Sequence, residues 1–434
     1  MPRVSSGPGE AVAAPDPGSA LATMLGASAL TTLGAIPPFL LGAQAVLMRR
    51  DLDFGAAGLG AAVSAFFAVA ALVTIGAGGA FERWSRRRGL LLAGTLVAAG
   101  GLGMALLAEG WVALMLLMAL LGAANAACQG SSNATVSTAL PPHRRGLGFG
   151  IKQSAVPAAI MFGGLAVPTT TALLGWRSTF LTTGVLGLVV VVAALLPDRS
   201  RRRPVRARRL RSGERAPRGP LLVAGASITF ASAAANFLGA YLASWAHGIG
   251  LTVGQAGLLM AAGSASSIVV RIVSGHRADR RHGGNLSLVA VQMFVGGACL
   301  ALIALLPFAW SVVLFGFVAF ALGWSWPGLL LYAVARVGRD APGQASSVVQ
   351  AGAFTGGALG PVLFGLVVGE VGFVAAWFTA SASFLVAGVL ALAARTGFRR
   401  DLRRRPPTTP FGYGGGRDRP RYTAGPRPAA EGGA

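Results

Sequence analysis

The chain has 434 residues, of which 54% are hydrophobic and only 12% are charged, and its formal net charge is +23. Soluble domains contain about a quarter charged residues, so this composition excludes an ordinary soluble enzyme. The same apolar fraction excludes a chain that is disordered throughout. In chain order, residues 1–22 come first; they combine a few charges with several Pro and Gly residues, which predicts a disordered tail and not a signal peptide.

Twelve apolar runs follow this tail, and each is about as long as a membrane span. A helix rises about 1.5 Å per residue, so roughly 20 uncharged residues cross about 30 Å of hydrocarbon. The runs lie at residues 24–48, 56–81, 89–108, 111–140, 147–174, 176–196, 221–246, 255–275, 286–306, 311–335, 345–369 and 373–394. They are too long for barrel strands, and a helix satisfies its own backbone in lipid. The sequence therefore predicts an all-α membrane protein with twelve transmembrane helices.

The basic residues are distributed unevenly between the two sets of loops. Of the 37 Lys and Arg residues, 32 lie in the two tails and in alternate loops, and the opposite loops hold only Arg49, Arg50 and Arg177. The positive-inside rule then predicts a protein of the plasma membrane with an even number of spans and both termini in the cytoplasm. The Arg-rich segments 199–218 and 395–405 are expected to face anionic lipid headgroups. Nucleic-acid binding is not expected, because no aromatic residues or binding motif accompany these segments.

An internal repeat divides the twelve spans into two sets of six. A shift of 197 residues superposes residues of scarce types, namely Glu82, Arg83 and Gln153 on Asp279, Arg280 and Gln350. Two parallel halves related by a pseudo-two-fold axis, with a solute site between them, are a known transporter plan. We expect a disordered cytoplasmic tail at 1–22, a first half at 23–196, a basic cytoplasmic linker at 197–219, a second half at 220–395 and a disordered cytoplasmic tail at 396–434.

A motif between spans two and three resembles the signature of the major facilitator superfamily, which is Gly-x-x-x-Asp-Arg-x-Gly followed by basic residues. At the corresponding positions this chain has Gly78, Glu82, Arg83, Ser85, Arg86 and Arg87. It therefore departs from the family's pattern at Glu82, which replaces the Asp, and at Ser85, which replaces the second Gly. The second half keeps the core of the motif in Gly275, Asp279 and Arg280. The resemblance covers residues 23–395.

We call the motif residues of both halves, except Ser85, the latch residues. The resemblance implies that they act together at the cytoplasmic side. It implies that Glu82 and Asp279 pair with arginines and helix ends of the neighbouring half. These pairs would hold the cytoplasmic side closed until the transport cycle breaks them. A carboxylate beside a helix N-terminus and a guanidinium makes a strong but breakable contact. The alternative is a charge cluster that only anchors a short loop.

A further resemblance concerns two cations that lie inside apolar runs. Lys152 and Gln153 in span five, and Arg271 in span eight, are similar to family branches that carry small anions, such as cyanate-type and monocarboxylate-type permeases. No Asp or Glu lies deep inside a span, so the interior ionisable groups are cationic and should face a cavity or a partner. If spans five and eight are neighbours, as in the family, these cations would attract an anionic solute. Alternatively, Lys152 reaches the cytoplasmic boundary or pairs with Asp279.

Neutral polar residues add further candidate solute contacts. Asn125 and Gln129 in span four are four residues apart, so they share one face of the helix, which should look inward. Such residues also form hydrogen bonds with neighbouring helices, and the sequence leaves both roles open. The family resemblance places spans one, four, seven and ten around the cavity. It therefore implies Asn236, Tyr241 and Trp326 as additional contacts.

The chain lacks the residues that catalysis, metal binding or ATP use would require. The four His residues lie at loops or span ends, and Cys128 and Cys299 lie in apolar runs without the spacing of metal ligands. No phosphate-binding Gly-Lys-Ser/Thr sequence is present. We therefore expect no enzyme activity, no cofactor and no metal site.

These observations predict a secondary active or facilitative transporter of a small organic or inorganic anion. It would work as a monomer, by alternating access between its two halves. Two alternatives stay open. The first is an efflux transporter for drugs or metabolites, which the aromatic residues near the expected cavity suggest. The second is a membrane sensor without transport, which would signal through the basic tail.

Overall fold

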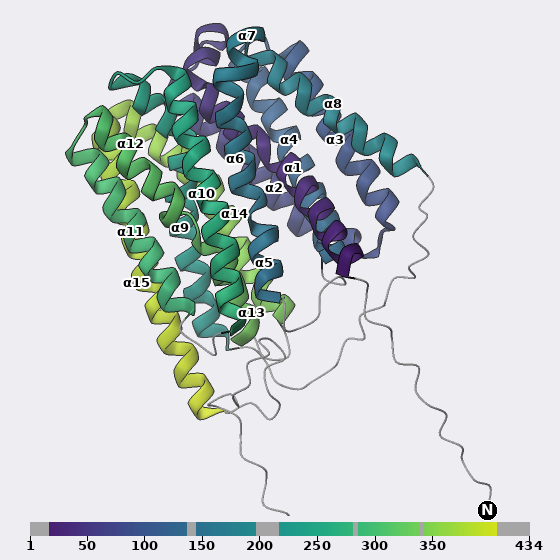
Figure 1. The fold of residues 1–434 in the computed structure, drawn as a ribbon, viewed down its shortest axis with the longest axis vertical. Helices are drawn as coiled ribbons and strands as arrows, with labels where there is room; N and C mark the ends of the chain where they lie inside the picture. The colour runs from purple at the N-terminus through teal and green to yellow at the C-terminus, as the bar shows by residue number, and fades with distance from the viewer. Residues whose placement is uncertain (1–16, 137–144, 197–216, 281–284, 338–341, 406–434) are drawn as a thin grey trace, which may run out of the picture.

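The computed structural model describes residues 17–136, 145–196, 217–280, 285–337 and 342–405 as a bundle of long helices (Figure 1). Within these residues no β-strand is present. Twelve helical segments of the described chain are long and apolar enough to cross a membrane. The predicted all-α fold with twelve spans is therefore confirmed.

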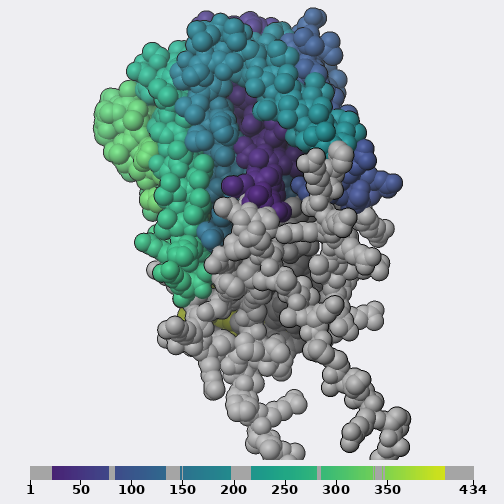
Figure 2. Space-filling model, turned by 45° about the vertical axis from the view of Figure 1, so that its right-hand side comes forward, coloured from purple at the N-terminus to yellow at the C-terminus, as the bar shows by residue number. Residues whose placement is uncertain are grey.

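Each half of the chain contributes six of these spans. The first half contains α1 (Pro17–Leu52), α2 (Ala56–Arg83), α3 (Arg86–Leu107), α4 (Trp111–Val136), α5 (Arg145–Gln153), α6 (Ala155–Ala166), the π-helical turn η2 (Val167–Thr171), α7 (Ala172–Leu174) and α8 (Trp176–Leu195). The second half contains α9 (Arg218–Gly248), α10 (Val253–Arg280), α11 (Asn285–Leu305), α12 (Ala309–Val318), the π-helical turn η3 (Ala319–Gly323), α13 (Trp326–Val337), α14 (Pro342–Glu370) and α15 (Phe373–Arg404). In the space-filling view the halves lie side by side, with the first coloured from purple through blue to teal and the second in green (Figure 2).

Two of the spans are interrupted along their length. Span five consists of α5, α6, η2 and α7, and Ser154 separates α5 from α6. Span ten consists of α12, η3 and α13, and Trp324 and Ser325 separate η3 from α13. Helix ends and π-helical turns leave some backbone carbonyls without their usual partner in the same helix. Such carbonyls are available to a side chain from a neighbouring helix.

Glycine residues allow several helices to approach each other closely. A Cβ atom at Gly101 of α3 would lie 2.5 Å from the backbone nitrogen of Gly184 in α8. A Cβ atom at Gly356 of α14 would lie 2.1 Å from the carbonyl oxygen of Thr229 in α9. Small residues at such crossings are characteristic of membrane helices, because close van der Waals packing drives their association in lipid.

The two halves meet through α2 with α14, through α5 and α6 with α10, and through α1 with α9. We call the end of the bundle where α1 begins and α15 ends the terminal end, and the opposite end the distal end (Figure 1). Toward the distal end, a Cβ atom at Gly42 of α1 would lie 2.6 Å from the Gly239 carbonyl oxygen of α9. Among the described residues, α4 and α13 make at most isolated contacts with each other at the terminal end. The two halves are therefore in contact at the distal end, between α1 and α9. At the terminal end, α4 and α13 are separated.

Some helices extend past the boundaries that the sequence predicts. α1 begins at Pro17, inside the predicted tail of residues 1–22, because proline suits the first turn of a helix, where its missing N–H would have no partner. α15 continues to Arg404, past the predicted boundary at residue 395, because Phe398 and Leu402 are buried one turn apart. Residues 17–22 and 396–404 of these predicted tails are therefore helical in the structure. Residues 1–16, 197–216 and 406–434 lie outside the described chain, so the predictions for them are untested.

Candidate solute-binding site

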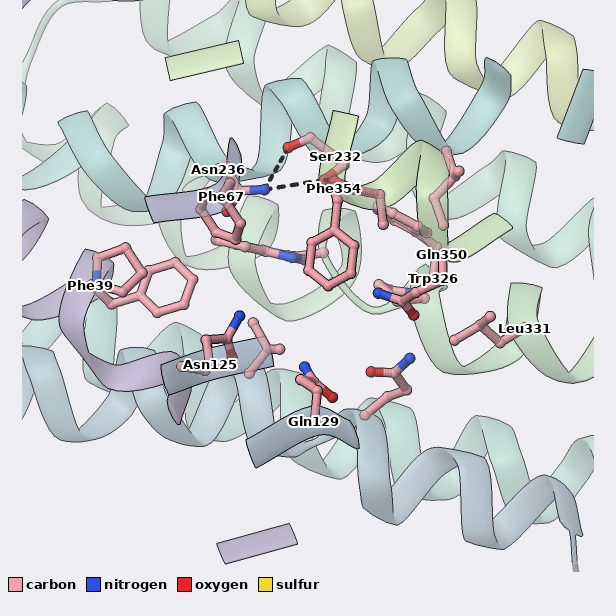
Figure 3. A pocket seen from close by; sticks show the side chains of 18 of the residues that line it. Phe39, Phe67, Asn125, Gln129, Ser232, Asn236, Trp326, Leu331, Gln350 and Phe354 are labelled. Atoms are coloured by element: carbon pink, nitrogen blue, oxygen red, sulfur yellow. Dashed lines mark hydrogen bonds between the residues drawn. The ribbon is translucent and has the colours of Figure 1, made fainter. Parts of the chain in front are cut away.

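A cavity of about 100 Å³ lies between the two halves (Figure 3). Its polar lining residues come from α4, α5, α9, α10 and α14, and they are Asn125, Gln129, Gln153, Ser232, Asn236, Arg271 and Gln350. Its aromatic lining residues come from α1, α2, α13, α14 and the break in span ten, and they are Phe39, Phe66, Phe67, Trp324, Trp326 and Phe354. Arg271 is the one charged side chain that the described part of the chain places on the cavity wall. The cavity thus combines one positive charge with several amides and aromatic rings.

Arg271 is buried, with only 2% of its surface exposed. Its Nη1 donates a hydrogen bond to the Gln153 carbonyl oxygen, and its Nη2 donates to the Trp324 carbonyl oxygen. Both carbonyls lie at helix breaks, since Gln153 ends α5 and Trp324 follows η3. The Nε of Arg271 has no hydrogen-bond partner among the described residues. Arg271 therefore joins the first half to the second, and no described carboxylate lines the cavity to balance its charge.

The structure brings together most of the predicted solute contacts. Besides Arg271, the cavity is lined by the predicted residues Asn125, Gln129, Gln153, Asn236 and Trp326. Lys152 does not line it, because the next position on a helix points about 100° away from Gln153. Gln350 also lines the cavity and is not among the predicted contacts, although the repeat that superposes it on Gln153 points to it. Binding of a solute by these residues stays a prediction.

Tyr241 lies away from the cavity, although it is predicted as a solute contact. Its side chain is fully buried, and its hydroxyl lies 2.8 Å from the Ala56 carbonyl oxygen and 3.1 Å from the Pro361 carbonyl oxygen. Five residues separate Tyr241 from Asn236, which turns the helix by about 140°, so the two side chains face different neighbours. Tyr241 instead connects α9 and α14 of the second half to the start of α2 in the first half.

Replacing Tyr241 by Phe should loosen the distal contact between the halves. The variant loses one net hydrogen bond, worth about 1 kcal/mol, which corresponds to about a fivefold change in an opening equilibrium. We expect hydrogen–deuterium exchange of the backbone amides at residues 56–60 to become about fivefold faster. Ser381→Ala is the control, because the Ser381 hydroxyl donates to the Gly297 carbonyl oxygen within the second half. Equal exchange at 56–60 in the Tyr241 variant and the wild type would contradict this role.

The second-half latch residues lie at the end of α10, next to α5. The Asp279 carboxylate accepts a hydrogen bond of 2.9 Å from the backbone N–H of Leu147, in the first turn of α5. A helix N-terminus carries a partial positive charge, so a carboxylate stabilises it. Gly275 lies beside this contact, because a Cβ atom at Gly150 would be 3.6 Å from the Gly275 Cα. Arg280 is exposed.

The first-half latch residues are described only in part. Arg86 and Arg87 are exposed at the start of α3. The side chains of Gly78, Glu82 and Arg83 lie outside the described part of the structure. The proposed release of the latch during a transport cycle therefore stays a prediction, and Asp279 is the residue at which it can be tested.

Replacing Asp279 by Asn should weaken the contact between α10 and α5 while keeping the shape of the side chain. A carboxylate at a helix N-terminus contributes about 0.3–1 kcal/mol, and salt screens this contribution. We therefore expect a lower thermal unfolding midpoint for the variant, with a difference from wild type that shrinks between about 0.05 and about 0.5 M salt. Glu370→Gln, at an exposed position at the end of α14, should leave the midpoint unchanged. A difference independent of salt would argue against a charge contribution.

Comparison with known proteins supports this architecture. The Major Facilitator Superfamily model matches residues 19–351 of this chain. Among solved structures, the chain is similar to a bacterial homolog of the human lysosomal transporter Spinster in an inward-facing and occupied conformation, with a TM-score of 0.63, 16% sequence identity, and coverage of 88% of this chain and 96% of that chain. The inward-facing, unoccupied conformation of that homolog gives a TM-score of 0.62 at 16% identity, with 88% and 97% coverage. Among curated proteins, none matches this sequence.

The family match covers most of both halves, and the structural similarity shows the same fold at low identity. The cavity lies where the two halves meet, with residues of both on its wall. These findings indicate a transporter rather than an enzyme, with a small-molecule solute and alternating access between the halves. The chain therefore belongs to the major facilitator superfamily and is an integral membrane transporter.

Proposed function

We propose that the transported solute is a small organic or inorganic anion, which binds in the cavity between the halves. The observation that carries this proposal is the buried guanidinium of Arg271, with no described carboxylate on the cavity wall. Two carbonyl oxygens satisfy part of the guanidinium, but they carry only partial charges. A charge at depth in a membrane protein is costly unless a partner or water compensates it. An anionic solute would supply the missing charge.

The size of the cavity favours a small solute over a drug-sized one. Its volume is about 100 Å³. Pockets for drug-sized ligands have volumes of about 300–1,000 Å³. This difference, together with the positive charge of Arg271, favours anion transport over the export of large or cationic compounds.

We also propose that the protein works as a monomer in the plasma membrane, with the terminal end of the bundle in the cytoplasm. The uneven distribution of basic residues between the loops supports this orientation. In this orientation the closed contact of α1 with α9 lies on the outer side. The separation of α4 from α13 then lies on the cytoplasmic side.

Uptake into proteoliposomes tests the solute class. We expect at least one small anion from a panel of nitrate, chloride, acetate, lactate and oxalate to accumulate faster than in protein-free vesicles. Tetraphenylphosphonium, a lipophilic cation, should show no protein-dependent uptake. Uptake of the cation with no uptake of any anion would overturn the proposal.

A further inference from the structure

Five amide side chains line the cavity, and they come from both halves of the protein. Asn125, Gln129 and Gln153 belong to the first half, and Asn236 and Gln350 to the second. Of these, only Asn236 forms a hydrogen bond through its side chain with another described residue. Asn125 is only 3% exposed, and its Oδ1 has no partner in the described structure. Buried polar groups are normally paired, so these amides are available to a bound molecule.

The orientation of the Asn236 amide is fixed by its neighbours. Its Nδ2 lies 2.9 Å from the Ser232 carbonyl oxygen and 3.1 Å from the Ser232 Oγ (Figure 3). The Ser232 hydroxyl donates in turn to the Ala353 carbonyl oxygen, at 2.7 Å, so its oxygen is free to accept. Two acceptors on one side require the NH₂ group of Asn236 on that side. The Oδ1 of Asn236 is therefore left as a hydrogen-bond acceptor.

This pattern does not suit an anion that only accepts hydrogen bonds. Nitrate, chloride or a simple carboxylate has no donor for an amide oxygen, so a site built for such an ion would contain donors alone. A hydroxyl group both donates and accepts, as an amide does. The aromatic rings of Phe39, Trp324 and Phe354 add apolar faces that suit the C–H groups of a short carbon chain.

We infer that the solute is a small hydroxylated carboxylate. Its carboxylate lies at Arg271, and its hydroxyl groups bind the amides of the two halves. Gln153 and Gln350 occupy equivalent positions in the internal repeat, so each half contributes one glutamine to the same solute. The inference rests on the proposed function, because it takes the solute to be an anion. The amides would add specificity for hydroxylated acids, which Arg271 alone does not provide.

Equilibrium binding to the full-length protein in lipid nanodiscs tests the inference with matched pairs of acids. The pairs are glycolate with acetate, and lactate and glycerate with propionate. We expect each hydroxylated acid to bind about fivefold more tightly than its partner, which corresponds to one net hydrogen bond of about 1 kcal/mol. Gln350→Met should reduce this preference severalfold, because it weakens binding of the hydroxylated acids more than binding of propionate. Gln292→Met is the matched control, because Gln292 is buried in α11 and does not line the cavity.

The outcomes separate this inference from the proposed function. Equal binding of lactate and propionate would overturn the inference while leaving an anion transporter. Binding of glycerol but of no carboxylate would overturn the proposed function, and with it the carboxylate part of the inference. If Gln350→Met and Gln292→Met reduce the preference for hydroxylated acids equally, the amides of the cavity do not bind the hydroxyl groups. A preference for hydroxylated acids that only Gln350→Met reduces supports the inference.

Discussion

Replacing Arg271 by Gln is expected to reduce the affinity for an anionic solute by about 10- to 150-fold. Hydrogen bonds to charged groups contribute about 1.5–3 kcal/mol, and each 1.4 kcal/mol corresponds to a factor of ten. The variant keeps a polar side chain at the cavity. It removes the one charged group among the described residues that line the cavity. Isothermal titration of the purified protein with the anion that the transport panel selects measures this effect.

The control variant is Arg277→Gln, which removes the same charge from the same helix at an exposed position. It should bind the anion as the wild type does. Arg271→Lys separates charge from geometry, because a lysine keeps the charge but lacks the planar set of donors that joins Gln153 and Trp324. We expect an intermediate affinity for Arg271→Lys. If Arg271→Gln lowers the unfolding temperature but leaves anion affinity unchanged, Arg271 only connects the halves and is not a solute contact.

Replacing Gly42 by Val is expected to slow transport about 5- to 150-fold without unfolding the protein. A Cβ atom at this position would lie 2.6 Å from the Gly239 carbonyl oxygen and 2.9 Å from the Ala240 Cα. These are backbone atoms of α9, so they cannot move aside as a flexible side chain can. Overpacking of this kind costs about 1–3 kcal/mol, which shifts an equilibrium about 5- to 150-fold. The variant should populate states in which the halves are separated at the distal end.

Gly26→Val is the matched control, because it lies on the same helix and a Cβ atom there would meet nothing within 4 Å. Proteoliposome uptake of the anion should fall about 5- to 150-fold for Gly42→Val and stay near the wild-type rate for Gly26→Val. Hydrogen–deuterium exchange should increase around Gly239 in the Gly42 variant only. A Gly42 variant that folds and transports at the wild-type rate would show that closure between α1 and α9 is not part of the cycle.

The fold could be predicted from the sequence because the thickness of the bilayer fixes the length of each span. The polar wall of the cavity could also be predicted in large part. Asn125 and Gln129 share a face of α4, and a polar face in a membrane helix avoids lipid. Arg271 follows from the same argument, since a charge in a span needs a cavity or a partner.

The sequence could not show how these side chains are bonded. The link from Arg271 to Gln153 and Trp324 depends on breaks in spans five and ten, and a continuous apolar run gives no sign of such breaks. The position of Tyr241 in span seven alone predicts a cavity contact, whereas its angular distance from Asn236 on the helix places it on another face. The many charges at the end of α15 predict a disordered tail, whereas the buried side chains of Phe398 and Leu402 continue the helix to Arg404.

We propose that the cavity between the halves is a positively charged passage, and cysteine modification tests this claim without knowledge of the solute. Gln129→Cys would be placed in a background with Cys128 and Cys299 changed to Ala, and treated with anionic and cationic methanethiosulfonate reagents. Gln129 and Arg271 line the same cavity. Two unit charges about 8 Å apart interact by about 2 kcal/mol at an effective dielectric constant of about 20. We predict that the anionic reagent reacts at least tenfold faster, relative to a free thiol, and that Arg271→Gln removes this preference. A faster reaction with the cationic reagent, or a preference that survives Arg271→Gln, would contradict the claim.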